Sequence, residues 1–587
     1  MSGGTDVSGG ADVSLVQVTD LSVEFGDLRA VDCLSFGLAR GAALALVGES
    51  GSGKSTVASA LLGLHRGTGA RVGGSIEVAG TDVQRASDDE LRRLRGAKAA
   101  MVFQDPLSSL DPYYAIGDQI AEVYRVHTRV SRRAARARAV DVLDRVGIPD
   151  AVRRSRSRPH EFSGGMRQRA LIAMALACEP DLLIADEPTT ALDVTVQAQI
   201  LDLLHTLREE TGMGLLLVTH DVGVAAESVD EVLVMRHGRR VEHGPVAGVL
   251  SAPAQTYTRE LLAAVPRVDA RRGASVTGGD DAGVAGEEGA GVAAGAVSAV
   301  SALSAVSAAE VGAGGPDGRP EVTGDVVLEA TGLRREFGRG KRAFAAVDGV
   351  SLAIRRGETL GVVGESGSGK TTLGRMLVGL LEPTAGEVRY DGHARVGVHP
   401  AVQMVFQDPV SSLNPRRSVG ESIADPLRAR GERDEKRIRG RVTELLERVG
   451  LEGAHYDRYP HEFSGGQRQR VGIARALAAD PRVIVCDEPV SALDVTTQAQ
   501  VVALLGELQR ELGLALVFVA HDLAVVRQVS DRVAVMRRGQ IVESGPADEV
   551  YDNPQDPYTK QLLAAVPSLD PQVAARRRVA RRELAAA

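Results

Sequence analysis

The chain has 587 residues, of which 44% are hydrophobic and 25% are charged, so its length favours more than one globular domain. A net charge of −8 argues against the basic footprint of a nucleic-acid-binding domain. The cysteines, Cys33, Cys178 and Cys486, lie far apart, which predicts neither a disulfide framework nor a zinc site and fits a reducing compartment. No stretch reaches the run of about 18 apolar residues that a membrane helix needs, and the first residues lack a signal-peptide pattern. We therefore expect a soluble, cytoplasmic chain.

After a flexible start at residues 1–13, the first predicted elements are a strand, a glycine-rich loop and a helix. The loop, GESGSGKS, fits the phosphate-binding pattern G-x-x-x-x-G-K-[ST]. Its glycines let backbone N–H groups turn toward phosphate oxygens, and the helix N-terminus adds a favourable dipole. Lys54 is expected at the β- and γ-phosphates, and Ser55 on Mg²⁺. The predicted nucleotide-binding residues are Gly48, Glu49, Ser50, Gly51, Ser52, Gly53, Lys54, Ser55 and Thr56.

Further along, residues 112–159 show helical patterns and predict a separate helical lobe. The apolar run LLIADE then predicts a strand that ends at Asp186 and Glu187. An acid at the carboxyl end of such a strand lies beside the phosphate loop. There Asp186 can hold the water shell of the metal ion, and Glu187 can polarise the attacking water. Alternation of apolar strands with helices predicts an α/β fold with a parallel sheet core.

The whole pattern occurs twice. FSGGMRQR at Phe162 and FSGGQRQR at Phe463 lie 301 residues apart, as do ADEP and CDEP. The first copy is 13 residues longer between its lysine and FQDP, in a charged stretch that predicts a surface helix and turn. The second phosphate loop predicts nucleotide contacts at Gly364, Glu365, Ser366, Gly367, Ser368, Gly369, Lys370, Thr371 and Thr372, with Thr371 and Asp487 on Mg²⁺ and Glu488 as the second base.

We expect domains at 14–267 and 326–572, a low-complexity linker at 268–325 and a basic tail at 573–587. The linker is rich in Ala, Gly, Val and Ser, so it cannot bury enough apolar surface to fold by itself. The basic runs RVSRRAARARA and RRRVARREL are interpreted as a solvated helix face and a frayed tail. Contact with anionic lipid headgroups is the alternative.

FSGGMRQR and FSGGQRQR resemble the signature motif of ATP-binding cassette (ABC) proteins. The resemblance covers nearly all of both halves and implies two P-loop NTPase domains, each with a mainly parallel sheet, an antiparallel β subdomain and a helical lobe. It implies ATP and Mg²⁺ as cofactors, ALDV at 191 and 492 as D-loops, and intramolecular dimerisation of the cassettes. The residues that it implies are Gln104 and Gln407 on the metal, His220 and His521 as catalytic γ-phosphate contacts, Phe25 and Phe337 on adenine, and Ser163, Gly164, Gly165, Ser464, Gly465, Gly466 and Gln467 as signature contacts.

In this family each ATP lies between the phosphate loop of one cassette and the signature of the other. The resemblance therefore implies one site with Lys54 and Ser464, and a second with Lys370 and Ser163. The first copy has Met166 where the second copy has Gln467, and this difference predicts the loss of one polar contact in the second site. Because both sites keep lysine, aspartate, glutamate and histidine, we expect both to hydrolyse ATP.

The segments MVFQDP, PHEFSGG and LLAAVP resemble those of oligopeptide, dipeptide and nickel importer ATPases. The resemblance implies an ATPase that energises an importer of peptides or related small solutes, nickel among them. Its partners would be two transmembrane permease subunits and an extracytoplasmic substrate-binding protein, which places it peripherally on the cytoplasmic face of the membrane. With no cysteine after either LLAAVP, we predict no iron–sulfur cluster.

Two alternatives stay open. One is the ATPase of an exporter, such as a drug efflux system, because transport direction is not encoded in the cassettes. The other is a ribosome-associated translation factor with tandem cassettes, which the acidic linker disfavours because phosphate contact requires basic residues.

Overall fold

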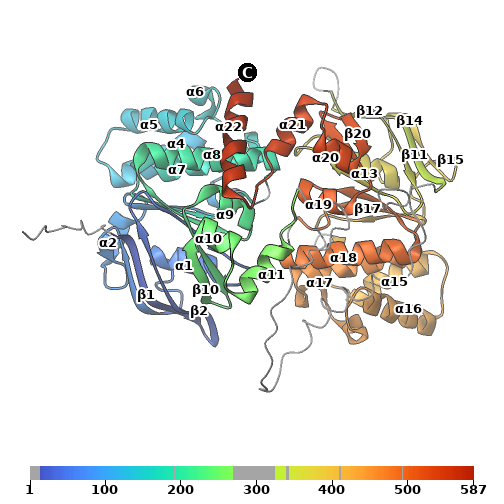
Figure 1. Cartoon of the computed structure of the whole chain (residues 1–587), viewed down its shortest axis with the longest axis horizontal. Helices are drawn as coiled ribbons and strands as arrows, with labels where there is room; N and C mark the ends of the chain where they lie inside the picture. Colours follow the sequence, from blue (N-terminus) through green and yellow to red (C-terminus); the bar gives the residue numbers. More distant parts are fainter. Residues whose placement is uncertain are drawn as a thin grey trace, which may run out of the picture.

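A computed structural model gives the structure of residues 14–190, 192–268, 324–338, 343–408, 412–491 and 493–586. It forms two α/β halves that lie side by side (Figure 1). The predicted flexible start, nearly all of the linker and the first residue of each ALDV segment lie outside these residues. Within them, no helix is long and apolar enough to cross a membrane.

The first half is built on two sheets. In the described residues one is antiparallel, in the order β2-β1-β4-β5, and the other has the order β10-β9-β3-β8-β7-β6. The second sheet is parallel except for the pair of β9 with β10. The strands of the first half are β1 Ser14–Phe25, β2 Leu28–Ala39, β3 Ala43–Val47, β4 Arg71–Val78, β5 Thr81–Asp82, β6 Ala99–Val102, β7 Leu182–Asp186, β8 Gly214–Thr219, β9 Glu231–Arg236 and β10 Arg239–Pro245.

Helices cover both faces of this parallel sheet, which is why β3, β7 and β8 are buried along their whole length. The helices are α1 Lys54–Leu61, α2 Asp88–Leu94, α3 Pro106–Ser109, α4 Ile116–His127, α5 Arg132–Arg145, α6 Ala151–Arg154, η1 Pro159–Glu161, α7 Gly164–Ala175, η2 Leu176–Cys178, α8 Val194–Thr211, α9 Val222–Ser228, α10 Val246–Ser251 and α11 Thr256–Ala264. The helical lobe expected at 112–159 is confirmed by α4 to η1, and α2 is the predicted surface helix of the longer first copy.

The second half repeats this architecture, with sheets in the orders β12-β11-β14-β15 and β16-β17-β18-β13-β19-β20. Its strands are β11 Val326–Phe337, β12 Phe344–Arg355, β13 Thr359–Val363, β14 Ala385–Tyr390, β15 His393–Arg395, β16 Val402–Val405, β17 Val483–Asp487, β18 Ala515–Val519, β19 Arg532–Arg537 and β20 Gln540–Pro546. Its helices are α13 Lys370–Val378, α15 Val419–Ala429, α16 Glu435–Arg448, η4 Gly453–Asp457, η5 Pro460–Glu462, α17 Gly465–Leu477, α18 Val495–Leu512, α19 Leu523–Val529, α20 Ala547–Asp552, α21 Pro557–Ala564 and α22 Pro571–Ala586.

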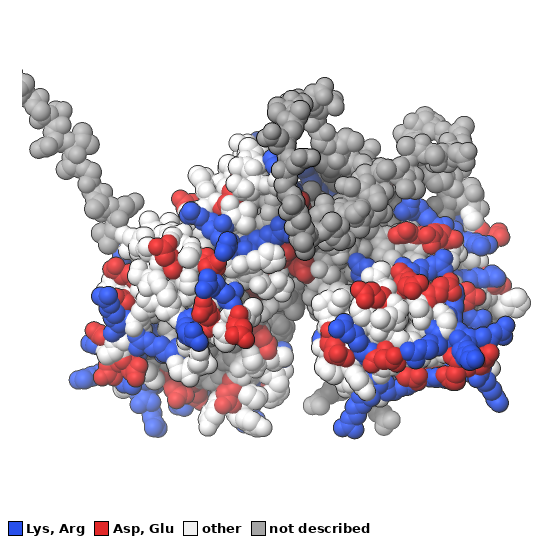
Figure 2. Space-filling view, turned by 90° about the horizontal axis from the view of Figure 1, so that it is seen from below, with Lys and Arg blue, Asp and Glu red and all other residues white. Residues whose placement is uncertain are grey.

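The two basic runs behave differently. On α5, Arg136 pairs with Asp118 at 2.9 Å and Arg138 pairs with Asp141 at 2.8 Å, as expected of a solvated helix face. On the face shown in Figure 2, basic and acidic side chains are intermixed over both halves. The expectation of a frayed basic tail is wrong, because α22 is a helix that packs against α9 of the first half. The boundary predicted at residue 572 falls inside this helix.

Candidate nucleotide-binding sites

The phosphate loops follow β3 and β13 and lead into α1 and α13. Gly53 has φ +97°, and a Cβ there would lie 2.4 Å from the carbonyl oxygen of Ala30, so only glycine fits. Gly369 has the same geometry, with φ +105° and a Cβ position 2.2 Å from the Ala346 oxygen. The Lys54 ammonium donates hydrogen bonds to the carbonyl oxygens of Gly48 and Glu49, both at 2.8 Å. Lys370 contacts its own loop in the same way, at Gly364 and Glu365.

Sheet topology explains how distant motifs meet. Strands β3, β8 and β7 are parallel neighbours, so their carboxyl ends share one edge. Ser55 lies in the first turn of α1, after β3, and donates a hydrogen bond to Asp186 at the end of β7, at 2.9 Å. Thr371 and Asp487 repeat this contact at 3.0 Å. Hydroxyl and carboxylate oxygens are the ligands that Mg²⁺ prefers, so both pairs fit this ion.

Burial shifts the pKa values of the ionisable groups at this edge. It raises the pKa of the Asp186 and Asp487 carboxyls, although the hydroxyl of Ser55 or Thr371 opposes the shift. Burial lowers the pKa of the Lys54 ammonium, against the attraction of the nearby carboxylates. Each site therefore holds charged groups that are poorly solvated and that gain from an ionic ligand.

The two candidate bases are held in an uncommon backbone conformation. Glu187 has φ +47° and Glu488 has φ +46°, in the left-handed region where non-glycine residues are rare. Residues held in this conformation often lie at functional sites. The Nε2 of Gln104 donates to Glu187 at 2.7 Å, and Gln407 donates to Glu488 at 2.6 Å. The predicted metal ligand Gln104 therefore contacts the candidate base.

The histidines after β8 and β18 face the same glutamates. Nδ1 of His220 lies 3.1 Å from Glu187, and Nδ1 of His521 lies 3.7 Å from Glu488. The hydrogen bond with Glu187 raises the pKa of His220 despite its burial. Burial acts to raise the pKa of Glu187, but the hydrogen bond and charge of His220 outweigh it, and the pKa is lowered. The geometry thus favours an ionised glutamate beside a protonated histidine.

The sites differ in how the glutamate is anchored. The Thr190 hydroxyl donates to the Glu187 carboxylate at 2.9 Å. At the corresponding place in the second half, the Ser491 hydroxyl donates to the backbone carbonyl of Glu488 at 3.2 Å. The carboxylate of Glu187 is therefore held more firmly than that of Glu488.

The signature motifs begin α7 and α17. Ser464 accepts a hydrogen bond from the Gln467 backbone, and the Gln467 side chain accepts one from the Ser464 N–H at 3.0 Å, a capping box. Ser163 also caps its helix, but Met166 has no side-chain acceptor to complete the box. In the structure Met166 leaves the capping box of α7 incomplete, and the loss of a nucleotide contact at this position stays a prediction. A Cβ at Gly165 would lie 2.4 Å from Val196, so this glycine permits close packing on α8.

The phosphate loop of each half faces the other half. The Thr195 hydroxyl donates to the Glu365 carboxylate at 2.7 Å, and the Thr496 hydroxyl donates to Glu49 at 3.1 Å. Asp494 of the second half acts electrostatically on Lys54, and Asp193 acts on Lys370.

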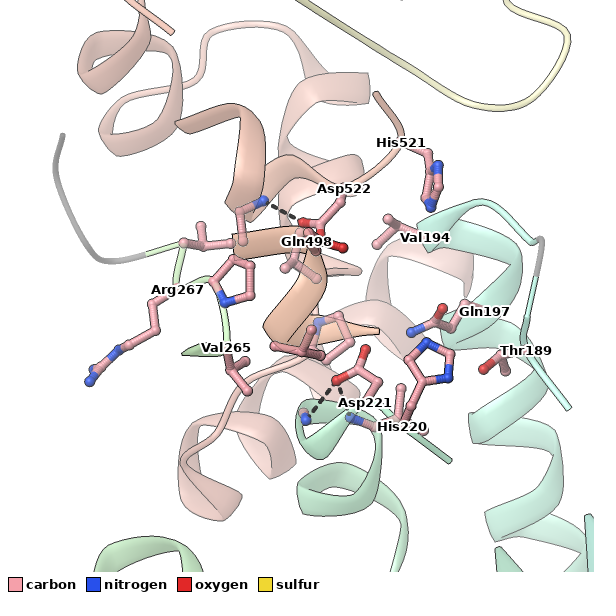
Figure 3. A pocket seen from close by; sticks show the side chains of 18 of the residues that line it. Thr189, Val194, Gln197, His220, Asp221, Val265, Arg267, Gln498, His521 and Asp522 are labelled. Atoms are coloured by element: carbon pink, nitrogen blue, oxygen red, sulfur yellow. Dashed lines mark hydrogen bonds between the residues drawn. The ribbon is translucent and has the colours of Figure 1, made fainter. Parts of the chain in front are cut away.

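A cavity of about 400 Å³ lies between the halves, lined by residues of both. Figure 3 shows His220 and His521 at its border, together with Gln197 of the first half. Glu488 also lines this space, so candidate catalytic residues of both halves border one shared cavity.

Several contact residues were missed from the sequence. The Tyr257 hydroxyl accepts a hydrogen bond from the Glu49 N–H at 3.3 Å, and Tyr558 accepts one from Glu365 at 3.0 Å. Arg236 lies over the Tyr257 ring at 4.6 Å. The repeat held a usable signal, since these tyrosines and the threonine pair of the cross-half contacts recur at the same offset of 301.

The aromatic residues expected on adenine lie at strand ends near the loops. Phe25 is 37% exposed and packs edge-on against His65, with 5.4 Å between ring centroids. Phe337 is half-buried beside Phe344, and Arg335 covers its ring at 5.1 Å. Phe25 is thus accessible to a planar ligand, while Phe337 already has a cation on one face.

Comparison with known proteins follows the same division into halves. The profile of the family described as "ABC transporter" matches residues 31–190 and again 347–491. The chain belongs to the ABC transporter family. A second profile, "Oligopeptide/dipeptide transporter, C-terminal region", matches residues 241–284 and 542–586. This ABC protein is therefore a two-cassette, ATP-binding transport ATPase of the oligopeptide/dipeptide importer group, as its motifs indicated.

Its relatives include proteins named "Glutathione import ATP-binding protein GsiA". The one from Salmonella choleraesuis is 46% identical over 96% of this chain and 91% of its own length. The one from Escherichia coli K12 is 45% identical over 95% of this chain and 90% of its own length. Among solved structures, a dimeric post-hydrolysis state of the ATP-binding cassette MJ0796 bound to ADP and Pi is 31% identical. It covers 38% of this chain and 98% of the other, with a TM-score of 0.35.

Proposed function

We propose that this ABC ATPase powers the import of a small peptide, glutathione being the first candidate, with two ATP molecules held between its halves. The relatives named for glutathione import support the solute class, and so does the match of both C-terminal segments to the oligopeptide/dipeptide transporter region. Both observations favour this role over drug efflux or action on ribosomes.

The observation that carries the two-site arrangement is the reciprocal pair of contacts between halves. Thr195 contacts Glu365 in the second phosphate loop, and Thr496 contacts Glu49 in the first. Two halves related in this head-to-tail way would direct the signature of each toward the loop of the other. We therefore propose one site with Lys54, Ser464 and Gly466, and a second with Lys370, Ser163 and Gly165.

The residues of each half fit complementary roles in hydrolysis. An ionised Glu187, fixed by Gln104 and His220, can orient water and accept its proton. The phosphate-loop amides and Lys54 would bind the phosphates. Ser55 and Asp186 would hold Mg²⁺, which supplies charge neutralisation between the phosphates when bound.

The segment after Gln104 is suited to a membrane partner. Leu107, Tyr113 and Tyr114 are 61%, 80% and 62% exposed, which is unusual for large apolar side chains. In the second half, an open groove of about 450 Å³ is lined by residues that include Met404, Phe406 and Pro426. We propose that cytoplasmic helices of two permease subunits dock at these places, at the inner face of the membrane, and that a separate extracytoplasmic protein captures the solute.

The test of the catalytic assignment is the double substitution Glu187→Gln and Glu488→Gln. Phosphate release should fall by about 10²–10⁴-fold while ATP binding is kept, because a general base is lost and the phosphate contacts stay. Each single variant should retain the turnover of the intact site. Full hydrolysis by the double variant would contradict the assignment.

The test of the solute is uptake of labelled glutathione, a dipeptide and Ni²⁺ by cells that carry the chain with its permeases and binding protein. Uptake of glutathione or dipeptide that is lost in the double glutamine variant supports the proposal. Uptake of Ni²⁺ alone, or ATP-dependent efflux in place of uptake, would contradict it.

A further inference from the structure

The C-terminal helix of the second half lies on the first half. In Figure 1, α22 is the last helix of the chain and stands beside α8 and α9 of the first half. Two arginines of α22 face these helices. Arg581 contacts Asp202 of α8 at 2.9 Å and Glu227 of α9 at 3.6 Å. Arg578 contacts Nε2 of His205 at 2.9 Å and donates to the backbone carbonyl of Glu227. Asp202, His205 and Glu227 are called the acidic recess below.

The contact is largely removed from water. The side chains of Glu227 and Arg581 are 2% and 11% exposed, and that of Asp202 is 22% exposed. Removing Arg581 or Asp202 leaves the other member of this largely buried ion pair without its opposing charge, which is strongly unfavourable. The recess and the arginines therefore form an interaction that is sensitive to the loss of either side.

The chain just before α22 extends the contact. The Ser568 N–H donates to Glu227 at 3.3 Å. A Cβ placed on Gly223 would lie 3.0 Å from Pro567, so the glycine lets the segment approach α9 closely. The contact thus runs continuously from Pro567 to Arg581.

In the described residues, the recess of the first half has no counterpart at the repeat position in the second half. At the offset of 301, Asp202, His205 and Glu227 correspond to Ala503, Gly506 and Gln528. The second half uses different chemistry at this place: the buried Arg527 pairs with Asp552 of its own half at 2.6 Å and donates to the carbonyl oxygen of Val268. The two halves therefore hold the incoming C-terminal segment of the other half by unlike contacts.

We propose that the acidic recess is a dedicated docking site for α22, and that the resulting clamp keeps the two halves attached when no nucleotide joins them. All partners in the clamp are protein groups, so their pairing requires no nucleotide. None of them belongs to the phosphate loops, the signatures or the catalytic residues. Opening of the nucleotide sites would then leave the clamp as the fixed point about which the halves separate.

The experiment measures the separation of the halves in the full chain without nucleotide. Spin labels on the exposed Cys33 and on Arg437→Cys, with Cys178→Ser to prevent a third label, report this distance by pulsed electron resonance. The test variant is Arg578→Ala/Arg581→Ala. The matched control is Arg576→Ala, because this arginine is on the same helix but exposed. Circular dichroism checks that each variant is folded.

We expect one narrow distance in the starting protein and in the control, and a separated population at least about tenfold larger in the double variant, as the loss of a buried ion pair predicts. ATP should return the double variant to the short distance. Asp202→Ala should reproduce the effect from the opposite side, and it replaces the double variant if that one misfolds. An unchanged distance in the folded variants, or an equal change in the control, would overturn the proposal. Because no hydrolysis is measured, the outcome is independent of the proposed transport function.

Discussion

The Thr195 hydroxyl of the first half lies 2.7 Å from the Glu365 carboxylate in the phosphate loop of the second half. It lies equally close to Asp193, at 2.7 Å, so its single proton is shared between two carboxylates of different halves. The backbone N–H of Glu365 also donates a hydrogen bond to the Tyr558 hydroxyl at 3.0 Å. This loop is thus supported both from its own half and from the other one.

Loss of the shared hydroxyl should weaken nucleotide use at the second site. Thr195→Val removes the donor and leaves two carboxylates facing each other. We therefore expect KM for ATP to rise by about 10- to 100-fold, as for a hydrogen bond to a charged group worth about 1.5–3 kcal/mol. Steady-state ATPase kinetics measure this. Thr195→Ser keeps the hydroxyl and should stay near the starting values. Equal KM values for the Val and Ser variants would contradict the role of the hydroxyl.

Thr190 should matter at one site only. Thr190→Val removes the hydrogen bond that holds the Glu187 carboxylate, so we expect kcat to fall several-fold, in line with about 1 kcal/mol for one such bond, with KM unchanged. The measurement is made in the Glu488→Gln background, where the first site carries turnover. In the Glu187→Gln background the same substitution should have no effect. A similar loss in both backgrounds would show that Thr190 acts on the fold rather than on Glu187.

Gly53→Ala should weaken ATP binding at the first site. The added Cβ would meet the Ala30 carbonyl oxygen at 2.4 Å, so the loop must shift. Gly51→Ala is the matched control, because it also has positive φ, at +79°, but no atom within 4 Å of the new Cβ. We expect a loss of affinity of at least about tenfold for Gly53→Ala, since the loop amides lose their alignment, and a much smaller loss for Gly51→Ala. Titration calorimetry with ATP compares the two.

Met166→Gln should stabilise the first half. The new amide can accept from the Ser163 N–H and complete the capping box that Gln467 forms in α17. We expect a gain of about 0.5–1 kcal/mol in the free energy of unfolding, seen as a higher Tm by calorimetry. The reverse change, Gln467→Met, should lower stability by a similar amount. If Met166→Gln instead lowered KM for ATP with no change in Tm, the side chain would act on nucleotide and not on the helix.

Stability should depend on pH through Glu227. Burial raises its pKa from 4.5 to about 7, against the opposing charges of Arg581 and Arg578, while Asp202 adds to the rise. The folded protein therefore holds this proton where the unfolded chain releases it. The resulting stabilisation is complete below about pH 4.5 and is lost as the pH rises through about 7, and it amounts to about 3 kcal/mol at 1.36 kcal/mol per pKa unit.

The measurement is Tm at pH 5.5 and at pH 8 for the starting protein and for Glu227→Gln. The amide keeps the shape of the protonated acid but cannot ionise, so the fall in Tm between the two pH values should be smaller in the variant. An identical fall in both proteins would contradict the assignment to Glu227.

Site residues that come together within one half could be predicted from the sequence. The phosphate loops, Asp186, Glu187 and His220 come together because β3, β7 and β8 are parallel neighbours, and apolar runs that end in these residues already indicate such a sheet. Contacts between the halves could not be predicted in this way. Thr195 meets Glu365 only after both halves are folded and docked, and a helix rich in Ala and Arg such as α22 has no periodicity that would distinguish a docked helix from a solvated tail.

The unlike surfaces around α22 also bear on which halves can pair. Two second halves would bring two basic helices toward Ala503, Gly506 and Gln528, where the carboxylates of Asp202 and Glu227 have no counterpart. Their guanidinium groups would lose hydration without an opposing charge, which penalises self-association of like cassettes. Partner choice in this duplicated molecule would thus be encoded away from its two reaction centres, in a few residues that diverged between the repeats.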